Sequence, residues 1–181
     1  MLRLRSRSPA ARRLAVACGL ASLVAAAAAE TSAVSPAGFT VGFEREVKAT
    51  PHELFRAIGR IGRWWNGEHT WSGDAAHLSL DLRAGGCFCE RWPAGSVQHA
   101  TVVWVGRDRM VRMVGSLGPL QELGVNGVLT FALKPAEGRT TLKVSYRVAG
   151  GTALEPLAPA VDRVIGEQVD RLVAYAEKEA R

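Results

Sequence analysis

Hydrophobic and polar residues alternate along most of the chain between His77 and Val148. The alternation is clearest from 142 to 148, where even-numbered positions are apolar and odd-numbered positions are polar. This period of two is typical of an antiparallel strand with one face buried and one face in water. Turn residues divide this pattern into separate strands, and an earlier segment rich in aromatic and β-branched residues adds one more. Together they predict strands over 39–48, 78–82, 87–92, 97–105, 109–117, 126–134 and 140–148.

Two segments have helical patterns instead. Thr50 can cap a helix that has Pro51 in its first position, and Glu53 can complete a capping box. We expect this helix and a second short one to end before Trp64-Trp65. Near the end of the chain, apolar residues recur on one helical face from Val161 to Ala176, which predicts a long amphipathic helix.

The order of these elements predicts an α+β fold. A sheet with one apolar face needs a cover, and the last helix is the only long element available for it. We therefore expect a curled antiparallel sheet of about six or seven strands around a long C-terminal helix. Two short helices would follow the first strand, and a cavity would lie between the sheet and the long helix.

The first 29 residues have a composition of their own. Five arginines precede an alanine-rich apolar run from Leu14 to Ala29 that ends in small residues, which is the pattern of a secretory signal peptide. A permanent membrane anchor is the alternative, but the run is shorter than the roughly 20 residues of a spanning helix. We expect cleavage after Ala29, a flexible tether over 30–38, one domain over 39–181, no membrane span after cleavage, and a periplasmic or secreted protein.

The leader also accounts for the basic charge of the chain. The whole sequence has 23 Lys and Arg against 17 Asp and Glu, and removing the five leader arginines leaves 18 against 17, a net charge near +1. Without a basic surface, a nucleic-acid partner is not expected.

Several of these segments resemble one known superfamily. The stretch Thr50-Pro-His-Glu-Leu-Phe, the Trp64-Trp65 pair, Leu82-Arg-Ala-Gly-Gly-Cys-Phe and the C-terminal helix are similar to START-like (SRPBCC) proteins. The nearest branch is the one called activator-of-Hsp90-ATPase-like or polyketide cyclase/dehydrase-like. The resemblance covers about residues 39–178 and implies a helix-grip fold with a hydrophobic cavity. It does not imply one activity, because the superfamily includes carriers, hormone binders, cyclases and co-chaperones.

Glu90 and His99 are the candidate acid–base pair. A turn centred on Ala94-Gly95 would place them opposite each other, and a carboxylate beside an imidazole can raise its basicity. His69 is a further acid–base candidate. The alternative for Glu90 and His99 is an ordinary cross-strand pair on a solvated face.

The same register predicts which strand residues line the cavity. It places Cys87, Cys89, Trp104 and Met113 on the less polar face of the sheet, and we expect that face to point inward. In a regular strand the Cβ atoms of Cys87 and Cys89 would be roughly 6–7 Å apart, too far for a disulfide. The preferred interpretation is that both cysteine side chains are apolar lining of the cavity. A strained disulfide and a reactive or metal-binding pair are the alternatives, although no metal-ligand spacing is present.

Two other segments could form walls of a ligand site. Trp64, Trp65, His69 and Trp71 crowd the segment after the short helices, and aromatic rings suit an apolar or ring-shaped ligand. The alternative is a role in the core, which we expect for at least one of the three tryptophans. Leu117 and Leu120 belong to an apolar segment that is either a mobile flap or a packed connector.

Three functions follow from these features. The preferred hypothesis is an exported binding or carrier protein for a hydrophobic small molecule or lipid, with no cofactor and no metal. The second is a cyclase or dehydratase that uses Glu90, His99 or His69 as acid and base. The third is a protein-interaction module of the cell envelope, which is expected if side chains fill the cavity.

Overall fold

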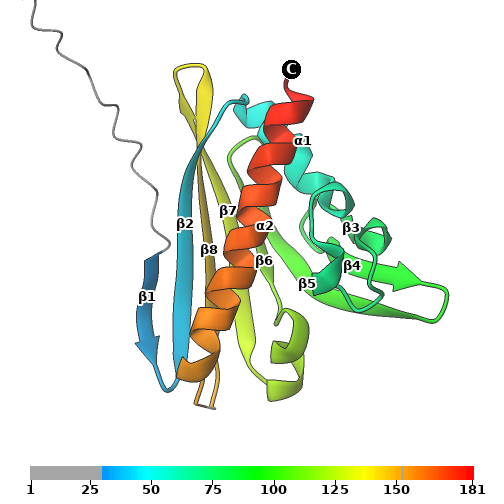
Figure 1. Ribbon diagram of the computed structural model, residues 1–181, viewed down its shortest axis with the longest axis vertical. Helices are drawn as coiled ribbons and strands as arrows, with labels where there is room; N and C mark the ends of the chain where they lie inside the picture. Colours follow the sequence, from blue (N-terminus) through cyan, green and yellow to red (C-terminus); the bar gives the residue numbers. More distant parts are fainter. Residues whose placement is uncertain (1–29, 152) are drawn as a thin grey trace, which may run out of the picture.

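The computed structural model describes residues 30–151 and 153–181, so the expected signal segment 1–29 lies outside the described residues. Eight antiparallel strands form one sheet in the order β1-β2-β8-β7-β6-β5-β4-β3 (Figure 1). The strands are β1 Glu30–Ser35, β2 Gly38–Val47, β3 Leu78–Leu80, β4 Cys87–Trp92, β5 Gly95–Gly106, β6 Met110–Val114, β7 Asn126–Ala136 and β8 Arg139–Ala149. The α-helices are α1 Pro51–Gly59 and α2 Ala158–Glu179, and the 3-10 helices are η1 Ile61–Arg63, η2 Gly67–His69, η3 Ala75–His77, η4 Gly118–Leu123 and η5 Glu155–Leu157.

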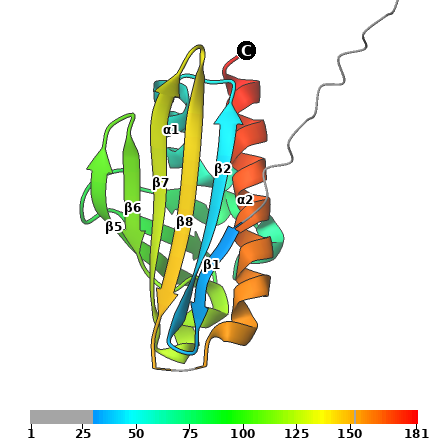
Figure 2. The same ribbon diagram turned by 90° about the vertical axis from the view of Figure 1, so that its left-hand side faces the viewer.

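The α+β arrangement is as predicted, but the strand count is higher than the six or seven expected. The additional strand is β1, which occupies most of the segment predicted as a flexible tether. It pairs with β2 at one edge of the sheet, with Thr31 opposite Val41 (Figure 2). Its sequence lacks the alternation of a half-buried strand, and backbone pairing at a sheet edge does not require that alternation.

The helix α1 begins as its sequence predicts. The N–H of Glu53 donates to Thr50 Oγ1 at 3.3 Å, and the N–H of Thr50 donates to Glu53 Oε2 at 2.8 Å. The capping box is therefore formed, with Pro51 in the first helical turn. The second short helix expected before Trp64 is the 3-10 helix η1.

The long helix α2 lies against the face around which the sheet curls (Figure 1). Its buried residues include Ile165, Val169 and Leu172, which belong to the same apolar cluster as Phe43 of β2 and Val144 of β8. The contact is close, because a Cβ added to Gly166 would lie 3.0 Å from the Phe43 ring. At this point side chains pack closely between sheet and helix, within the interface where the sequence predicts a cavity.

Two β-bulges in β5 decide which side chains face inward. Trp92 pairs with Gly95 across a two-residue turn, so Glu90 pairs with Val97 and not with His99 as the predicted register has it. Cys89 pairs with Gln98 and Phe88 with Ala100, which leaves His99 as an extra residue of β5. The second bulge leaves Val103 as an extra residue between two pairs, Val102 with Met113 and Trp104 with Arg112.

The bulges correct part of the predicted inner face. Met113 is fully buried, as expected for an inward residue. Trp104 was expected to line the cavity, but it is 47% exposed and lies beneath the Arg112 guanidinium, whose carbon is 5.5 Å from the ring centroid. The alternation could not predict this exposure, because each bulge reverses the face on which later residues lie.

Within the described residues, no helix is both long enough and apolar enough to span a membrane.

Candidate functional site

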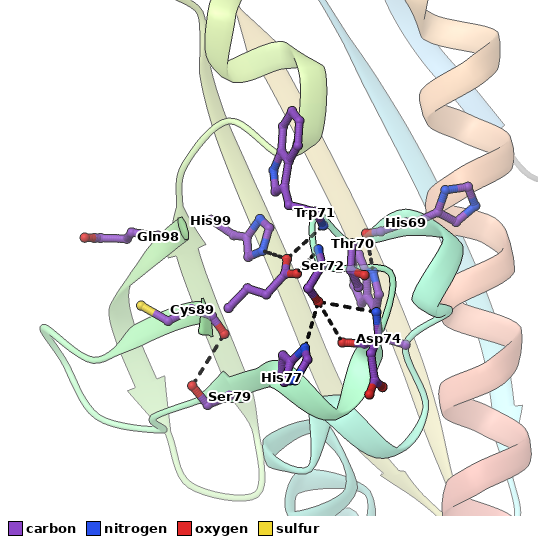
Figure 3. Close-up of polar contacts among 12 residues, drawn as sticks. His69, Thr70, Trp71, Ser72, Asp74, His77, Ser79, Cys89, Gln98 and His99 are labelled. Carbon is purple, nitrogen blue, oxygen red and sulfur yellow. Dashed lines mark hydrogen bonds and ion pairs between the residues drawn. The ribbon is translucent and has the colours of Figure 1, made fainter. Parts of the chain in front are cut away.

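A buried carboxylate organises the polar cluster at the β4–β5 end of the sheet. Glu90 is fully buried, and its Oε2 lies 3.1 Å from Nε2 of His99, which is also buried. The N–H of Trp71 donates to Glu90 Oε2 at 3.1 Å, and the N–H of Ser72 donates to Oε1 at 2.5 Å. His99, Trp71 and Ser72 gather around one point in Figure 3. One carboxylate thus joins two strands to the loop that precedes η3.

The first β-bulge explains how His99 reaches the carboxylate. As the extra residue of β5, His99 points inward beside Ala100, and both side chains are buried. In an unbroken strand, two consecutive residues would lie on opposite faces. Gly115 supports this arrangement, because a Cβ there would lie 2.6 Å from the Ala100 Cα. The predicted pair therefore meets, although on the buried face and not on a solvated one.

The hydrogen bonds and burial of the pair set its charge state. Burial alone would raise the pKa of Glu90, but hydrogen bonds from Ser72, Trp71 and His99 outweigh it and lower that pKa below its ordinary value. Burial lowers the pKa of His99, and the neighbouring Glu90 opposes this only in part. At neutral pH we therefore assign a carboxylate at Glu90 and a neutral imidazole whose Nε2–H donates to it.

Hydrogen bonds hold both ends of the loop that carries Trp71. At its start, the N–H of Asn66 donates to Gln168 Oε1 at 2.7 Å, and Asn66 Nδ2 donates to Glu167 Oε1 at 2.6 Å. At its end, Ser72 Oγ lies 2.9 Å from Nδ1 of His77. Trp71 itself is 47% exposed. The loop thus presents a large aromatic ring to solvent from a backbone that is held at several points.

Of the other aromatic candidates, Trp64 and Trp65 belong to the core. Both are buried, and the indole N–H of Trp64 donates to the Ala57 carbonyl at 2.8 Å. The rings form a row from the core to the cluster, with centroids 5.7 Å apart for Trp64–Trp65, 5.5 Å for Trp65–Phe88 and 4.8 Å for Phe88–His99. This row packs the inner side of the cluster and gives His99 an apolar wall.

His69 does not join the Glu90 cluster. Its Nε2 lies 3.2 Å from Glu167 Oε2 of α2, at the exposed start of the loop. We find no contact between His69 and Glu90 or His99 among the described residues, so the structure places the third acid–base candidate apart from the other two.

The segment with Leu117 and Leu120 is a packed connector. Leu120 is buried, Leu117 packs against the core, and the N–H of Leu117 donates to Tyr146 Oη at 3.0 Å. Burial raises the pKa of Tyr146 to about 12, so its hydroxyl stays protonated. Gln121 Nε2 also donates to the Gln98 carbonyl at 3.0 Å, which fixes η4 to β5 beside the bulge.

Cys87 and Cys89 form a disulfide, which corrects the preferred interpretation of two free apolar side chains. Their Cα atoms are 5.3 Å apart, less than the roughly 6.6 Å of two residues in a regular strand. The bulge of β5 lies directly opposite this part of β4. In Figure 3 the Cys89 sulfur points away from His99, so it does not line the Glu90 cluster.

One hollow among the described residues lies outside the position expected for the cavity. It has a volume of about 420 Å³, lies between η1 and β3, and is lined by Gly59, Arg60, Ile61, Gly62, Arg63, Ala76, Leu78, Ser79 and Leu80. Among the described residues, no group of three or more His, Cys, Asp or Glu side chains is arranged to hold a metal ion.

No pattern in the sequence indicates that N–H groups of the loop donate to Glu90. The N–H groups of Trp71 and Ser72 are backbone atoms about 20 residues away along the chain, and every non-proline residue has such a group. The only available signal was the isolated acidic residue in an apolar strand, because a buried carboxylate must find hydrogen-bond donors.

Comparison with known proteins identifies the fold. No protein-family model matches the chain, and no curated protein matches its sequence. An uncharacterised protein from Rhizobium leguminosarum is similar in structure at 20% identity, covering 83% of this chain and 97% of that chain with a TM-score of 0.57. CalU16 from Micromonospora echinospora is similar at 17% identity, covering 84% and 88% with a TM-score of 0.55.

DynU16, a protein in the dynemicin biosynthetic locus, is similar at 21% identity, covering 76% of this chain and 47% of that chain with a TM-score of 0.56. At these identities the likeness concerns the fold alone. The chain is therefore similar in fold to these three proteins, with a curled sheet and C-terminal helix that are compatible with a helix-grip arrangement.

Proposed function

We propose that this protein is an exported binding protein for a hydrophobic small molecule, aromatic or lipid-like, with Trp71 and His99 at its binding site. One observation carries the proposal: the fully buried Glu90 carboxylate holds the backbone of the half-exposed Trp71 in place. An exposed indole on a restrained loop offers apolar area to a ligand without a large loss of conformational freedom on binding.

The polar part of the site suits recognition. With its Nε2 proton directed at Glu90, a neutral His99 has Nδ1 as a hydrogen-bond acceptor. A ligand that combines an apolar ring or chain with one O–H or N–H donor would complement Trp71 and His99 together. Sites for small molecules commonly have this composition, with mostly apolar walls and a few placed polar groups.

The state of Glu90 favours binding over acid–base catalysis. A general acid needs a proton to give near the working pH, and hydrogen bonds lower the pKa of Glu90. Both of its oxygens already accept hydrogen bonds. We therefore assign Glu90 as a positioning residue for Trp71, Ser72 and His99.

The disulfide supports the export part of the proposal. Disulfides persist in oxidising compartments such as the bacterial periplasm and are rare in the cytosol. The Cys87–Cys89 bond therefore agrees with the leader-like composition of residues 1–29.

Native mass spectrometry of the protein purified from its own host tests the proposal. A bound molecule is expected as an extra mass that is lost on denaturation. The mass of the denatured protein is expected to match a chain that begins at Glu30. If the protein carries no extra mass and binds no apolar probe, small-molecule binding is wrong. Co-purification with an envelope protein would then favour the interaction module.

The alternative function is a cyclase- or dehydratase-type enzyme, and the 3.1 Å contact between His99 and Glu90 is the observation that favours it. In that case His99 Nδ1 would accept a proton from the ligand while Glu90 stabilised the resulting imidazolium. Once a bound ligand is identified, His99→Gln would separate the two functions. An enzyme would lose turnover by about 10²-fold or more, whereas a carrier would return the same molecule unchanged.

A further inference from the structure

The Cys87–Cys89 disulfide lies directly across the sheet from the bulge that places His99. Cys87 pairs with Thr101 and Cys89 pairs with Gln98, which are the two residues on either side of the bulged His99-Ala100 step. On β5, Gln98 Nε2 donates to Thr101 Oγ1 at 2.7 Å. The bulge is thus bracketed by a covalent bond on β4 and by a hydrogen bond on β5.

A disulfide of this kind contributes little to the stability of the whole fold. Its two cysteines are separated by one residue, and the stabilisation from loop closure grows with the length of the loop. The chain also has an extended cluster of packed apolar side chains to which neither cysteine belongs, although Cys89 is buried. The effect of the bond is therefore local, on the spacing of β4 next to Phe88 and Glu90.

One end of the disulfide is accessible to a thiol. Cys87 is partly exposed, whereas Cys89 is buried. A reductant thiol therefore reaches the sulfur of Cys87 more easily, and Cys89 is then the leaving group.

We propose that Cys87–Cys89 is a reversible thiol–disulfide exchange site for a dithiol reductant, and that its reduction loosens the contact between His99 and Glu90. A reductant thiolate attacks Cys87 Sγ, the Cys87–Cys89 bond breaks, and Cys89 leaves as a thiolate. The second thiolate of the reductant then attacks the reductant's other sulfur, which is bonded to Cys87 in the mixed disulfide, and releases Cys87. Two electrons pass to the protein, the reductant becomes a disulfide, and its two protons are available to the two cysteines.

The structural consequence follows from the spacing of β4. Without the bond, the Cα atoms of Cys87 and Cys89 can separate from 5.3 Å toward the roughly 6.6 Å of a regular strand. Phe88 lies between them and contacts the His99 ring, and Glu90 comes directly after. Extension of β4 therefore moves both inner neighbours of His99, and with Glu90 it moves the anchor of Trp71 and Ser72.

Titration with reduced and oxidised dithiothreitol tests this inference in the protein with Cys18→Ser, which leaves two cysteines to count. In the folded protein we expect two alkylated thiols per chain after reduction. In the same samples, NMR signals of the Trp71 and Ser72 amides and of the His99 ring should shift. Amides near the Thr140–Ala49 hydrogen bond, at the far end of the sheet, should not.

The Cys87→Ser/Cys89→Ser variant should give the reduced spectrum under oxidising conditions. If this variant does not fold, the titration alone decides. Thiols that become reactive only on unfolding would overturn the exchange site, and reduction that leaves the three signals unchanged would overturn the coupling. These readouts need no ligand, so a failure of small-molecule binding would be distinguishable from a failure of this inference.

Discussion

His99 Nε2 lies 3.1 Å from Glu90 Oε2 between two buried side chains, yet the Cα atoms of these residues are not partners in the sheet. Glu90 pairs with Val97, and His99 reaches the carboxylate only because it is the extra residue of a β-bulge. The geometry of the site therefore depends on the bulge as much as on the two residues.

Replacement of Glu90 by glutamine should destabilise the fold and free the Trp71 loop. An amide nitrogen cannot accept a hydrogen bond, so at least one donor among His99, Trp71 and Ser72 would lose its partner. The expected loss in the free energy of unfolding is about 1.5–3 kcal/mol, as for hydrogen bonds to charged groups. Urea denaturation measures it, with Glu44→Gln as the control because Glu44 is an exposed strand carboxylate paired with Lys143. Equal effects of the two substitutions would contradict the role given to Glu90.

Acidification should weaken the fold in two stages. The folded pKa of His99 lies below the ordinary 6.5, so the unfolded chain takes up this proton first and stability falls as the pH drops below about 6.5. The folded pKa of Glu90 lies below the ordinary 4.5, so its contribution is present above that pH and is lost as the pH falls through the folded value. Unfolding free energies measured between pH 8 and pH 3 give both slopes. His99→Gln should reduce the first slope, and an unchanged pH profile in this variant would refute the assignment.

The bulge should not tolerate a side chain at Gly115. A Cβ at this position would lie 2.6 Å from the Ala100 Cα, so Gly115→Ala must push β5 and β6 apart. The expected cost is about 1–3 kcal/mol of unfolding free energy, together with altered signals of the His99 ring. Gly151→Ala is the matched control, because a Cβ there would meet no atom within 4 Å and its φ is not positive. A Gly115→Ala protein with unchanged stability would show that the close approach is unimportant.

Local patterns were sufficient for much of the fold. The Thr50–Glu53 capping box, the amphipathic face of α2 and the alternation of β8 each depend on neighbours in the chain, and each element forms where the sequence predicts it. The β1 strand was not predictable in this way, because its pairing with β2 is a backbone interaction without an apolar pattern.

The candidate site was predictable only in part. A simple hairpin register placed Glu90 opposite His99, and the side chains do meet, but through a bulge that this register does not contain. The same register failed for Trp104, which lies beyond a second bulge. Neither bulge has a local sequence signal here, and both accompany the inward packing of Ala100 and Val102 against strands from other parts of the chain.

A comparison of two tryptophan variants tests ligand binding at this site most directly. Trp71 and Trp104 are each 47% exposed, so replacing either by alanine removes a similar exposed surface, but only Trp71 is anchored through Glu90. Fluorescence titration with the neutral apolar probe N-phenyl-1-naphthylamine measures binding. We expect at least about tenfold weaker binding for Trp71→Ala, equivalent to about 1.4 kcal/mol, and unchanged binding for Trp104→Ala. Equal binding by both variants and the unmodified protein would contradict a binding site at Trp71.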